Sequence, residues 1–233
     1  MVFIRCLCAM WWVAFSLGMV LPTRGQGIKV GRNVLVSKDP QNRMFFETEI
    51  AARSDSSDHL IGCAMASRPD DSYSTVVFVS INGGESWKET LDVYDELSNF
   101  DPSCTFGVES SAYFVSFGFP VGHPDEHTTT RLYRSLNSGQ TWGKPVILPG
   151  GIDRTWVTVD ISPTSKYRGH VYVTGKRDRR TLDPGLSLEN LLILLSSDMG
   201  RTFRAFDVPS LAPQVDASRP VLLQSGDPCG RGL

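Results

Sequence analysis

The eight residues SINGGESW, at positions 80–87, decide the fold because their pattern occurs twice more along the chain. SLNSGQTW occupies 135–142 and SSDMGRTF occupies 196–203. All three fit the template Ser-x-(Asn/Asp)-x-Gly-x-(Ser/Thr)-aromatic, which we call the box. Their third positions are 55 and 61 residues apart (137 − 82 = 55 and 198 − 137 = 61). Self-similarity at such intervals indicates a repeat architecture.

Each box lies between two strand-like segments. The runs STVVFVS, TTRLYRS and NLLILLS precede the three boxes, and short strand-like pieces such as KPVIL follow them. Asn and Asp side chains accept hydrogen bonds from backbone N–H groups a few residues further on, and glycine readily adopts a left-handed backbone. We therefore interpret each box as a self-contained hairpin turn rather than as a ligand site.

Two more apolar runs precede the third strand of every unit, so each unit contains four short strands. In the second unit these runs are DPSCTFGV and AYFVSFGF. Four-stranded units of about 40–60 residues are typical of propeller blades. We predict an all-β fold, a β-propeller of four-stranded antiparallel blades with about three complete blades plus the start of a fourth, apparently an incomplete ring. The predicted blades span 43–95, 99–149 and 151–209, and the next begins at 214–225.

The N-terminus has the three-part organisation of a secretory signal peptide. Arg5 is followed by sixteen uncharged residues, CLCAMWWVAFSLGMVL, and then by the polar segment PTRGQG. The apolar run is shorter than the roughly 20 residues of a membrane span, so we expect no stable span. The predicted domains are a signal peptide at 1–25, an N-terminal segment at 26–42 and a partial propeller at 43–233. The mature protein should be secreted or periplasmic.

Composition excludes several classes of function. The chain has 233 residues and a net charge of −2, so no basic excess indicates a nucleic-acid partner. The cysteine and histidine spacing supports neither a metal site nor a cofactor. Cys63 and Cys104 lie in apolar strand-like runs, and two alternatives remain for them: a disulfide formed in an oxidising compartment, or two buried thiols.

An acidic residue precedes or opens each predicted first strand. The spacings are 54, 52 and 63 residues (101 − 47, 153 − 101 and 216 − 153). First strands line a propeller channel, so these acids should gather at one mouth and the boxes at the opposite end. The acids could act on a sugar or bind a cation, or each could simply bond backbone N–H groups of a loop. The predicted set is Glu47, Asp101, Asp153 and Asp216.

Two neighbours of Asp153 could contribute to such a site. Arg154 follows it directly and could bind an anionic substrate through a bidentate contact with a carboxylate. Trp156, on the same predicted strand, is interpreted as inter-blade core, with a sugar-stacking platform as the alternative.

The boxes resemble the Asp-box, or BNR repeat, of sialidase-like β-propellers, whose pattern is Ser-x-Asp-x-Gly-x-x-Trp. Asn replaces Asp in the first two copies, and Phe replaces Trp in the third. The resemblance covers roughly residues 40–225, and DRTWVTVD and GHVYVTGKR are similar to strands of bacterial secreted exo-α-sialidase-like proteins. It implies a glycan-directed, sialidase-like activity that needs no cofactor.

The chain also departs from that family. Its sialidases carry an early Phe/Tyr-Arg-Ile-Pro segment and about six blades, whereas this chain has no such segment and about three blades. The full catalytic set is therefore not expected here, and we interpret the chain as an N-terminal portion, a truncated product, or one that completes its ring with another copy. Exposed blade faces favour self-association.

Two hypotheses for function follow. One is a glycosidase that uses the acidic mouth and Arg154 on a glycan or another anionic carbohydrate. The alternative is a non-catalytic extracytoplasmic propeller that serves as a binding or scaffold module.

Overall fold

The computed structural model describes residues 31–38, 42–123, 128–177 and 191–208. All strands of the described residues belong to one compact unit, which begins at Val34. The signal peptide predicted at 1–25 and the fourth blade predicted at 214–225 lie outside the described residues.

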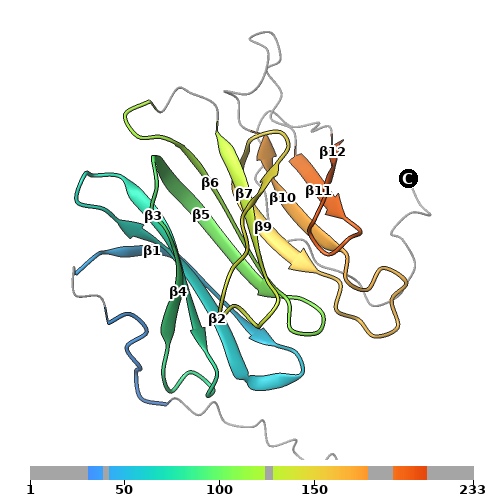
Figure 1. The fold of residues 1–233 in the computed structure, drawn as a ribbon, viewed down its shortest axis with the longest axis horizontal. Helices are drawn as coiled ribbons and strands as arrows, with labels where there is room; N and C mark the ends of the chain where they lie inside the picture. Colours follow the sequence, from blue (N-terminus) through green and yellow to red (C-terminus); the bar gives the residue numbers. More distant parts are fainter. Residues whose placement is uncertain (1–30, 39–41, 124–127, 178–190, 209–233) are drawn as a thin grey trace, which may run out of the picture. The chain divides into compact units, whose positions relative to one another are not determined.

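Three four-stranded antiparallel sheets make up the described fold, and each strand pairs with its neighbour in the sequence (Figure 1). This confirms the predicted all-β class with propeller-type blades. Blade 1 contains β1 (Phe45–Arg53), β2 (Ser56–Ser67), β3 (Tyr73–Ser80) and β4 (Lys88–Val93). Blade 2 contains β5 (Leu97–Phe106), β6 (Ala112–Pro120), β7 (Thr129–Ser135) and β8 (Val146–Leu148). Blade 3 contains β9 (Ile152–Val159), β10 (Val171–Arg177), β11 (Leu191–Ser196) and β12 (Arg204–Val208).

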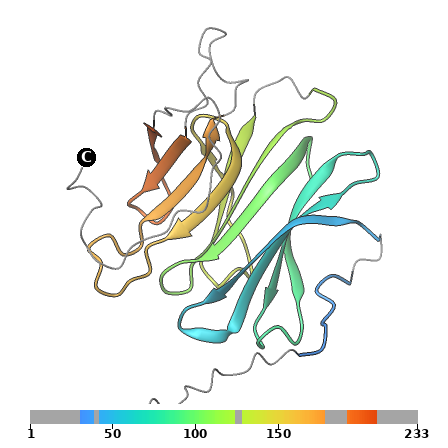
Figure 2. The same ribbon diagram turned by 180° about the vertical axis from the view of Figure 1, so that it is seen from behind.

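The sheets are stacked face to face, with the first strands β1, β5 and β9 side by side in both views (Figures 1 and 2). Alternate residues along each strand point to opposite faces, so a sheet that lies between two others needs apolar residues on both faces. In β6, Tyr113 and Val115 belong to the core shared with blade 3, whereas Ala112 and Phe114 belong to the core shared with blade 1. This double burial explains the nearly continuous apolar sequence of β6.

The cysteine pair lies in the core between blades 1 and 2. Cys63 on β2 and Cys104 on β5 are both free and buried. Burial raises the pKa of the Cys63 thiol well above its ordinary value, and the neighbouring Cys104 raises it further. Of the two alternatives, the structure therefore shows a pair of buried thiols, which act as small apolar groups in the core.

Each first strand contains a β-bulge at the same place, where two residues face one on the neighbouring strand. The bulged pairs are Glu47–Thr48, Asp101–Pro102 and Arg154–Thr155. The first residue of each has a positive φ, of 48°, 44° and 55° respectively, which is uncommon for a residue with a side chain. The bulges define the equivalence of the blades, because they repeat at intervals of 54 and 53 residues (101 − 47 and 154 − 101).

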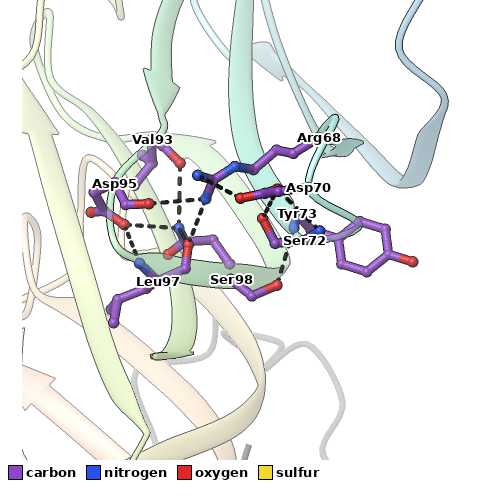
Figure 3. Close-up of polar contacts among 9 residues, drawn as sticks. Arg68, Asp70, Ser72, Tyr73, Val93, Asp95, Leu97 and Ser98 are labelled. Carbon is purple, nitrogen blue, oxygen red and sulfur yellow. Dashed lines mark hydrogen bonds and ion pairs between the residues drawn. The ribbon is translucent and has the colours of Figure 1, made fainter. Parts of the chain in front are cut away.

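Blade 1 is joined to blade 2 through a buried arginine (Figure 3). Arg68, whose side chain is 6% exposed, donates hydrogen bonds to the carbonyl oxygens of Asp95 and Leu97, at 2.9 and 3.0 Å. Its guanidinium lies 3.7 Å from the ring centroid of Tyr94 and forms an ion pair with Asp70 at 3.5 Å. These contacts fix the short connection that positions β5 beside β1.

Candidate functional site

The bulges bring together three side chains from three different blades. Glu47, Asp101 and Arg154 each occupy the first bulge position on neighbouring first strands. A bulge residue with left-handed backbone turns its side chain out of the regular alternation of the strand. The three side chains therefore lie close together. This place is near the beginning of β1 and of β9, and it is beside the middle of the longer strand β5.

A chain of hydrogen bonds links these positions from blade to blade. The backbone N–H of Asp101 donates to Oε2 of Glu47 at 3.2 Å, and the backbone N–H of Arg154 donates to Oδ2 of Asp101 at 2.8 Å. The Thr155 hydroxyl adds a bond to the carbonyl oxygen of Asp101 at 2.8 Å. The carboxylates of Glu47 and Asp101 thus each accept a hydrogen bond from a backbone N–H group, as the loop-bonding alternative proposed. The N–H group does not belong to a neighbouring loop, however, but to the bulge of the following blade.

The carboxyl group of Asp101 has a pKa raised to about 7. Burial is the largest cause, because it disfavours the charged form. The charge of Glu47 and a hydrogen bond between the two carboxyl groups raise the pKa further, and so does the charge of Asp153. The hydrogen bond from the Arg154 amide acts in the opposite direction but is outweighed. Close to neutral pH, the Asp101 carboxyl group is therefore still partly protonated.

These residues line a pocket of about 300 Å³. Its wall combines carboxyl, guanidinium and indole groups, a mixture suited to a polar ligand that also has an apolar face. Trp156 is half-buried and is one of the residues that line this pocket, and its alternative role as a sugar-stacking platform stays a prediction. The lining residues are Glu47, Thr48, Glu49, Asp101, Pro102, Arg154, Thr155 and Trp156.

The structure brings Glu47, Asp101 and Arg154 together and places Asp153 outside the pocket that they line. Asp153 precedes the bulge of β9 and faces Lys176 on β10, so Arg154 rather than Asp153 is equivalent to Glu47 and Asp101. Asp153 does not line the pocket but lies near enough to act on the pKa of Asp101. Asp216 lies outside the described residues.

Glu49 was missed by the sequence argument. It lies two residues after Glu47, and the bulge between them changes which side chains share a face. The only sequence signal for Glu49 is the Glu-Thr-Glu pattern at 47–49, and such alternation of charged residues is common on exposed strands. In the structure Glu49 lines the pocket, and both of its carboxylate oxygens are buried.

The boxes lie at the other ends of the blades, after β3, β7 and β11. Because the third strand of each sheet runs parallel to the first, the turn after it lies at the end opposite to the start of the first strand. The backbone N–H of Gly83 in the first box accordingly bonds to the carbonyl oxygen of Asp58, near the β1–β2 turn, at 2.9 Å. The predicted separation of boxes and acids is therefore correct.

Within each box the side chains bond to their own turn. In the second box, Oγ of Ser135 accepts from the N–H of Gly139 at 2.9 Å, and Oδ1 of Asn137 accepts from the N–H of Thr141 at 2.9 Å. The first and third boxes repeat both bonds. As predicted, each box is a hairpin turn that its own Ser and Asn or Asp side chains hold together.

The described part of the chain has no group of three or more His, Cys, Asp or Glu residues arranged to hold a metal ion. None of the elements in that part is a helix of a length and hydropathy that would allow it to cross a membrane.

No protein-family model and no curated protein matches this sequence. Among solved structures, the leech intramolecular trans-sialidase has a TM-score of 0.56 at 11% identity, over 86% of this chain and 47% of that one. The NanB sialidase of Streptococcus pneumoniae has a TM-score of 0.56 at 10% identity, over 76% and 46%. A family 117 glycoside hydrolase of Zobellia galactanivorans has a TM-score of 0.50 at 12% identity, over 77% and 60%.

At such low identity, the likeness establishes the fold alone. This chain spans about half of the length of the solved sialidases and hydrolases that it matches. The three described sheets are therefore similar to a part of these folds, with blades of the β-propeller kind.

Proposed function

We propose that this chain is a glycan-directed, sialidase-like propeller of the glycoside-hydrolase type, and that the pocket of Glu47, Asp101 and Arg154 binds the sugar. The observation that carries the proposal is the pKa of Asp101, about 7, in a pocket that also presents an arginine and a tryptophan. A carboxyl group that is still partly protonated near neutral pH can donate a proton to the oxygen of a leaving group.

Each lining residue has a role in this proposal. Asp101 is the proton donor, and the charge and hydrogen bond of Glu47 raise the pKa of Asp101. Arg154 binds an anionic group on the sugar, because a guanidinium matches the two oxygens of a carboxylate. Trp156 supplies an apolar surface for one face of the sugar ring.

The hydrogen bond between Glu47 and Asp101 limits what Glu47 can do. Paired catalytic carboxyl groups of glycosidases are about 5–5.5 Å apart in retaining enzymes and about 6.5–9.5 Å apart in inverting enzymes. Two carboxyl groups in direct hydrogen-bonding contact are closer than either spacing. Glu47 is therefore proposed as the partner of the acid, not as the nucleophile.

The experiment is a hydrolysis assay with fluorogenic glycosides, including a sialoside and a neutral arabinofuranoside. We expect Asp101→Asn to lower kcat about 10²-fold or more, the usual contribution of a general acid. Arg154→Ala should raise KM for the sialoside and leave KM for the neutral glycoside unchanged. Arg204→Ala, which alters an exposed arginine on β12, is the matched control. If the wild-type chain hydrolyses no glycoside in the panel, the catalytic proposal is wrong.

A non-catalytic binding module is the second candidate. It is favoured by the observation that both acids already accept hydrogen bonds from backbone amides of the next blade. In that case, calorimetric titration with acidic and neutral oligosaccharides should show binding without turnover, and Trp156→Ala should abolish it. No heat of binding for any sugar would contradict this candidate.

We also propose that the protein acts outside the cytoplasm, on the basis of the signal-like segment at 1–25. Expression of the full chain followed by mass measurement of the exported protein tests this. We expect a mature chain that begins near Gly25 or Gln26, and an uncleaved chain retained in the cytoplasm would contradict it.

A further inference from the structure

A second pocket lies at the box end of the joint between blades 2 and 3, where the third box packs over the end of β7. A Cβ atom on Gly200 of that box would lie 3.4 Å from Cδ2 of Leu132, and Nη1 of Arg134 donates to the carbonyl oxygen of Met199 at 3.2 Å. The pocket has a volume of about 500 Å³. We call it the box-joint pocket, and its wall includes Arg134, Leu136, Thr141, Trp142, Lys144 and Arg201.

Three cationic side chains line the box-joint pocket, and none of its lining residues is acidic. Arg134 belongs to β7, Lys144 follows the second box, and Arg201 is part of the third. Burial raises the pKa of the Tyr113 phenol, and the charges of Arg134 and Arg201 act against this rise, so both guanidinium groups lie near that phenol. A cleft lined by one sign of charge concentrates ions of the opposite sign.

The two guanidinium groups keep most of their donors for another partner. Within the described residues, neither forms an ion pair: Arg134 donates to the carbonyl oxygen of Met199 and Arg201 to that of Asp198, both at 3.2 Å. The carboxylate of Asp198 is directed into its own turn, where it accepts from the hydroxyl of Thr202 at 2.6 Å. Since a guanidinium has five donors, both arginines can also bind an anion in the pocket.

The equivalent positions carry no excess of cations at the joint between blades 1 and 2. That joint is packed in a similar way, because a Cβ atom on Gly139 of the second box would lie 2.9 Å from Cγ2 of Val79, at the end of β3. Counted from the boxes, the residues equivalent to Arg134, Lys144 and Arg201 are Val79, Glu89 and Gln140. Blade packing therefore does not require the three cations, and their gathering is specific to the box-joint pocket.

The second box adds a hydroxyl donor to this pocket. Oδ1 of Asn137 accepts from the N–H of Thr141 at 2.9 Å, so Nδ2 faces Oγ1 of Thr141 and donates to it at 2.9 Å. The proton of the Thr141 hydroxyl is therefore directed away from Asn137 and can be donated to a ligand. In the third box, by contrast, Thr202 donates its proton to Asp198. Asn in place of Asp thus makes the Thr141 hydroxyl a donor for the pocket.

The other part of the wall is apolar and suits one face of a small ring. Leu136 is exposed, and Trp142 is half-buried with its indole at the pocket. The C–H face of a sugar ring packs well on such a surface. The whole chain has a net charge of −2, so three local cations suit a small anion rather than a long polyanion. The volume of the pocket is also in the range of small-molecule sites.

We propose that the box-joint pocket binds a small sugar that carries a sulfate or phosphate ester. Arg134, Lys144 and Arg201 bind the ester oxygens through charge-assisted hydrogen bonds, and the Thr141 hydroxyl donates one more. The apolar wall contacts the ring. This site lies at the opposite end of the blades from the pocket of Glu47 and Asp101, and the proposal does not depend on the proposed catalytic function.

The test is calorimetric titration of the 233-residue protein with glucose 6-sulfate, glucose 6-phosphate and glucose. We expect binding of at least one ester and none of glucose, and the tighter ester identifies the group that the site prefers. Arg201→Gln and Lys144→Gln, both at exposed positions, should each weaken binding about tenfold. Lys88→Gln removes the same charge from an exposed position on blade 1, outside the pocket, and should leave the affinity unchanged.

Asn137→Asp separates ligand binding from a structural role of the turn. The Thr141 hydroxyl should then donate to the new carboxylate, as Thr202 does to Asp198, so the pocket loses a donor and gains a repulsive charge. We expect the ester to bind at least tenfold more weakly while unfolding in urea stays as in the wild type. Asn82→Asp makes the same change in the first box, away from this pocket, and should not affect binding.

Two kinds of result would overturn the proposal. One is the same affinity for glucose as for both esters, or no heat of binding for either ester. The other is an ester that still binds to Arg201→Gln with wild-type affinity but no longer binds to Arg154→Ala, which would locate it in the pocket of Glu47 and Asp101.

Discussion

At the scale of single residues, the site depends on three bulge residues with left-handed backbone. A residue with a side chain at positive φ costs of the order of 1 kcal/mol, so its repetition at Glu47, Asp101 and Arg154 needs a compensating contact. The hydrogen bonds between these residues supply that contact, because each carboxylate binds the next bulge. The same geometry places two carboxyl groups together and raises the pKa of Asp101.

The first prediction concerns the pH dependence of stability. Asp101 has a folded pKa of about 7, above the ordinary 3.8 of an unfolded aspartate, so the folded state binds the proton more tightly. Its contribution to the free energy of unfolding is therefore full below about pH 4 and is lost as the pH rises from about 4 to about 7. The loss amounts to at most about 4 kcal/mol. Asp101→Asn should remove this pH-dependent loss, as measured by urea unfolding at pH 5 and pH 8.

The matched control for this measurement is Asp58→Asn, which alters an exposed aspartate away from the pocket. In this control variant, the free energy of unfolding should differ between pH 5 and pH 8 by the same amount as in the wild type. An equal pH dependence in the wild type and in Asp101→Asn would show that the Asp101 carboxyl group is not the cause.

The second prediction concerns the residue that faces the third bulge. Gly175 lies opposite Arg154 and Thr155, and a Cβ atom there would lie 1.9 Å from Cγ2 of Ile152 and 2.9 Å from the carbonyl oxygen of Asp153. Gly175→Ala should therefore lower the free energy of unfolding by about 1–3 kcal/mol. Gly62→Ala is the control, because its nearest atoms would be at 3.5 and 3.7 Å. Equal stability of the two variants in urea would contradict the packing argument.

At the scale of the elements, the boxes explain why three different sequences form the same turn. In the first two boxes, Nδ2 of Asn82 and of Asn137 donates to a hydroxyl oxygen, whereas in the third the Thr202 hydroxyl donates to Asp198. The hydroxyl rotates to suit either partner. Partial burial opposes ionisation of Asp198, but bonds from Thr202 and Ser196 outweigh it and hold its pKa below the usual range.

The third prediction follows from the ability of the box hydroxyl either to accept a hydrogen bond from Asn or to donate one to Asp. Asn137→Asp should change the free energy of unfolding by less than about 0.5 kcal/mol at neutral pH, because the Thr141 hydroxyl can reverse its bond as Thr202 does. Asn137→Ala should cost about 1–3 kcal/mol, since the N–H of Thr141 and the hydroxyl of Ser135 lose their partner. Thermal or urea unfolding of both variants separates these outcomes. If the two substitutions cost the same, the side-chain bonds do not hold the turn.

At the scale of the whole molecule, stability comes from the contacts between blades. Fully buried side chains on β6 face two different cores, so blade 2 is stabilised from both sides, while the described residues of blades 1 and 3 share a core with a neighbouring blade on one side each. A stack of this kind gains stability from nearest-neighbour contacts, as repeat proteins do.

The fourth prediction follows from that difference. Trp142 packs against Phe114 in the core between blades 1 and 2, with ring centroids 6.3 Å apart, so Trp142→Ala should cost about 3–5 kcal/mol. Trp87→Ala removes the equivalent residue of the first box, which packs on a smaller cluster within blade 1, so it should cost less. Urea unfolding of the two variants measures both losses. A larger loss for Trp87→Ala would contradict the proposed order of the contacts.

The sequence alone predicts the boxes more completely than it predicts the site. The turns of the boxes could be predicted because the bonds of their Ser and Asn or Asp side chains to the backbone lie within eight consecutive residues, so residue types and spacing are sufficient. The strand count followed from the repeat, and the run NLLILLS was correctly interpreted as a strand, β11. The acids were located only approximately, because a bulge inserts one residue and leaves no clear trace in the sequence.

The sequence by itself determined the turns, the four-strand repeat and the apolar faces of the blades, since these depend on local hydrogen bonds and on the alternation of side chains along a strand. Only the tertiary structure decided that Arg154 rather than Asp153 joins Glu47 and Asp101, and that Asp101 retains a proton near neutral pH. Both depend on contacts between residues more than 50 positions apart, where the bulge of one blade meets the carboxylate of another.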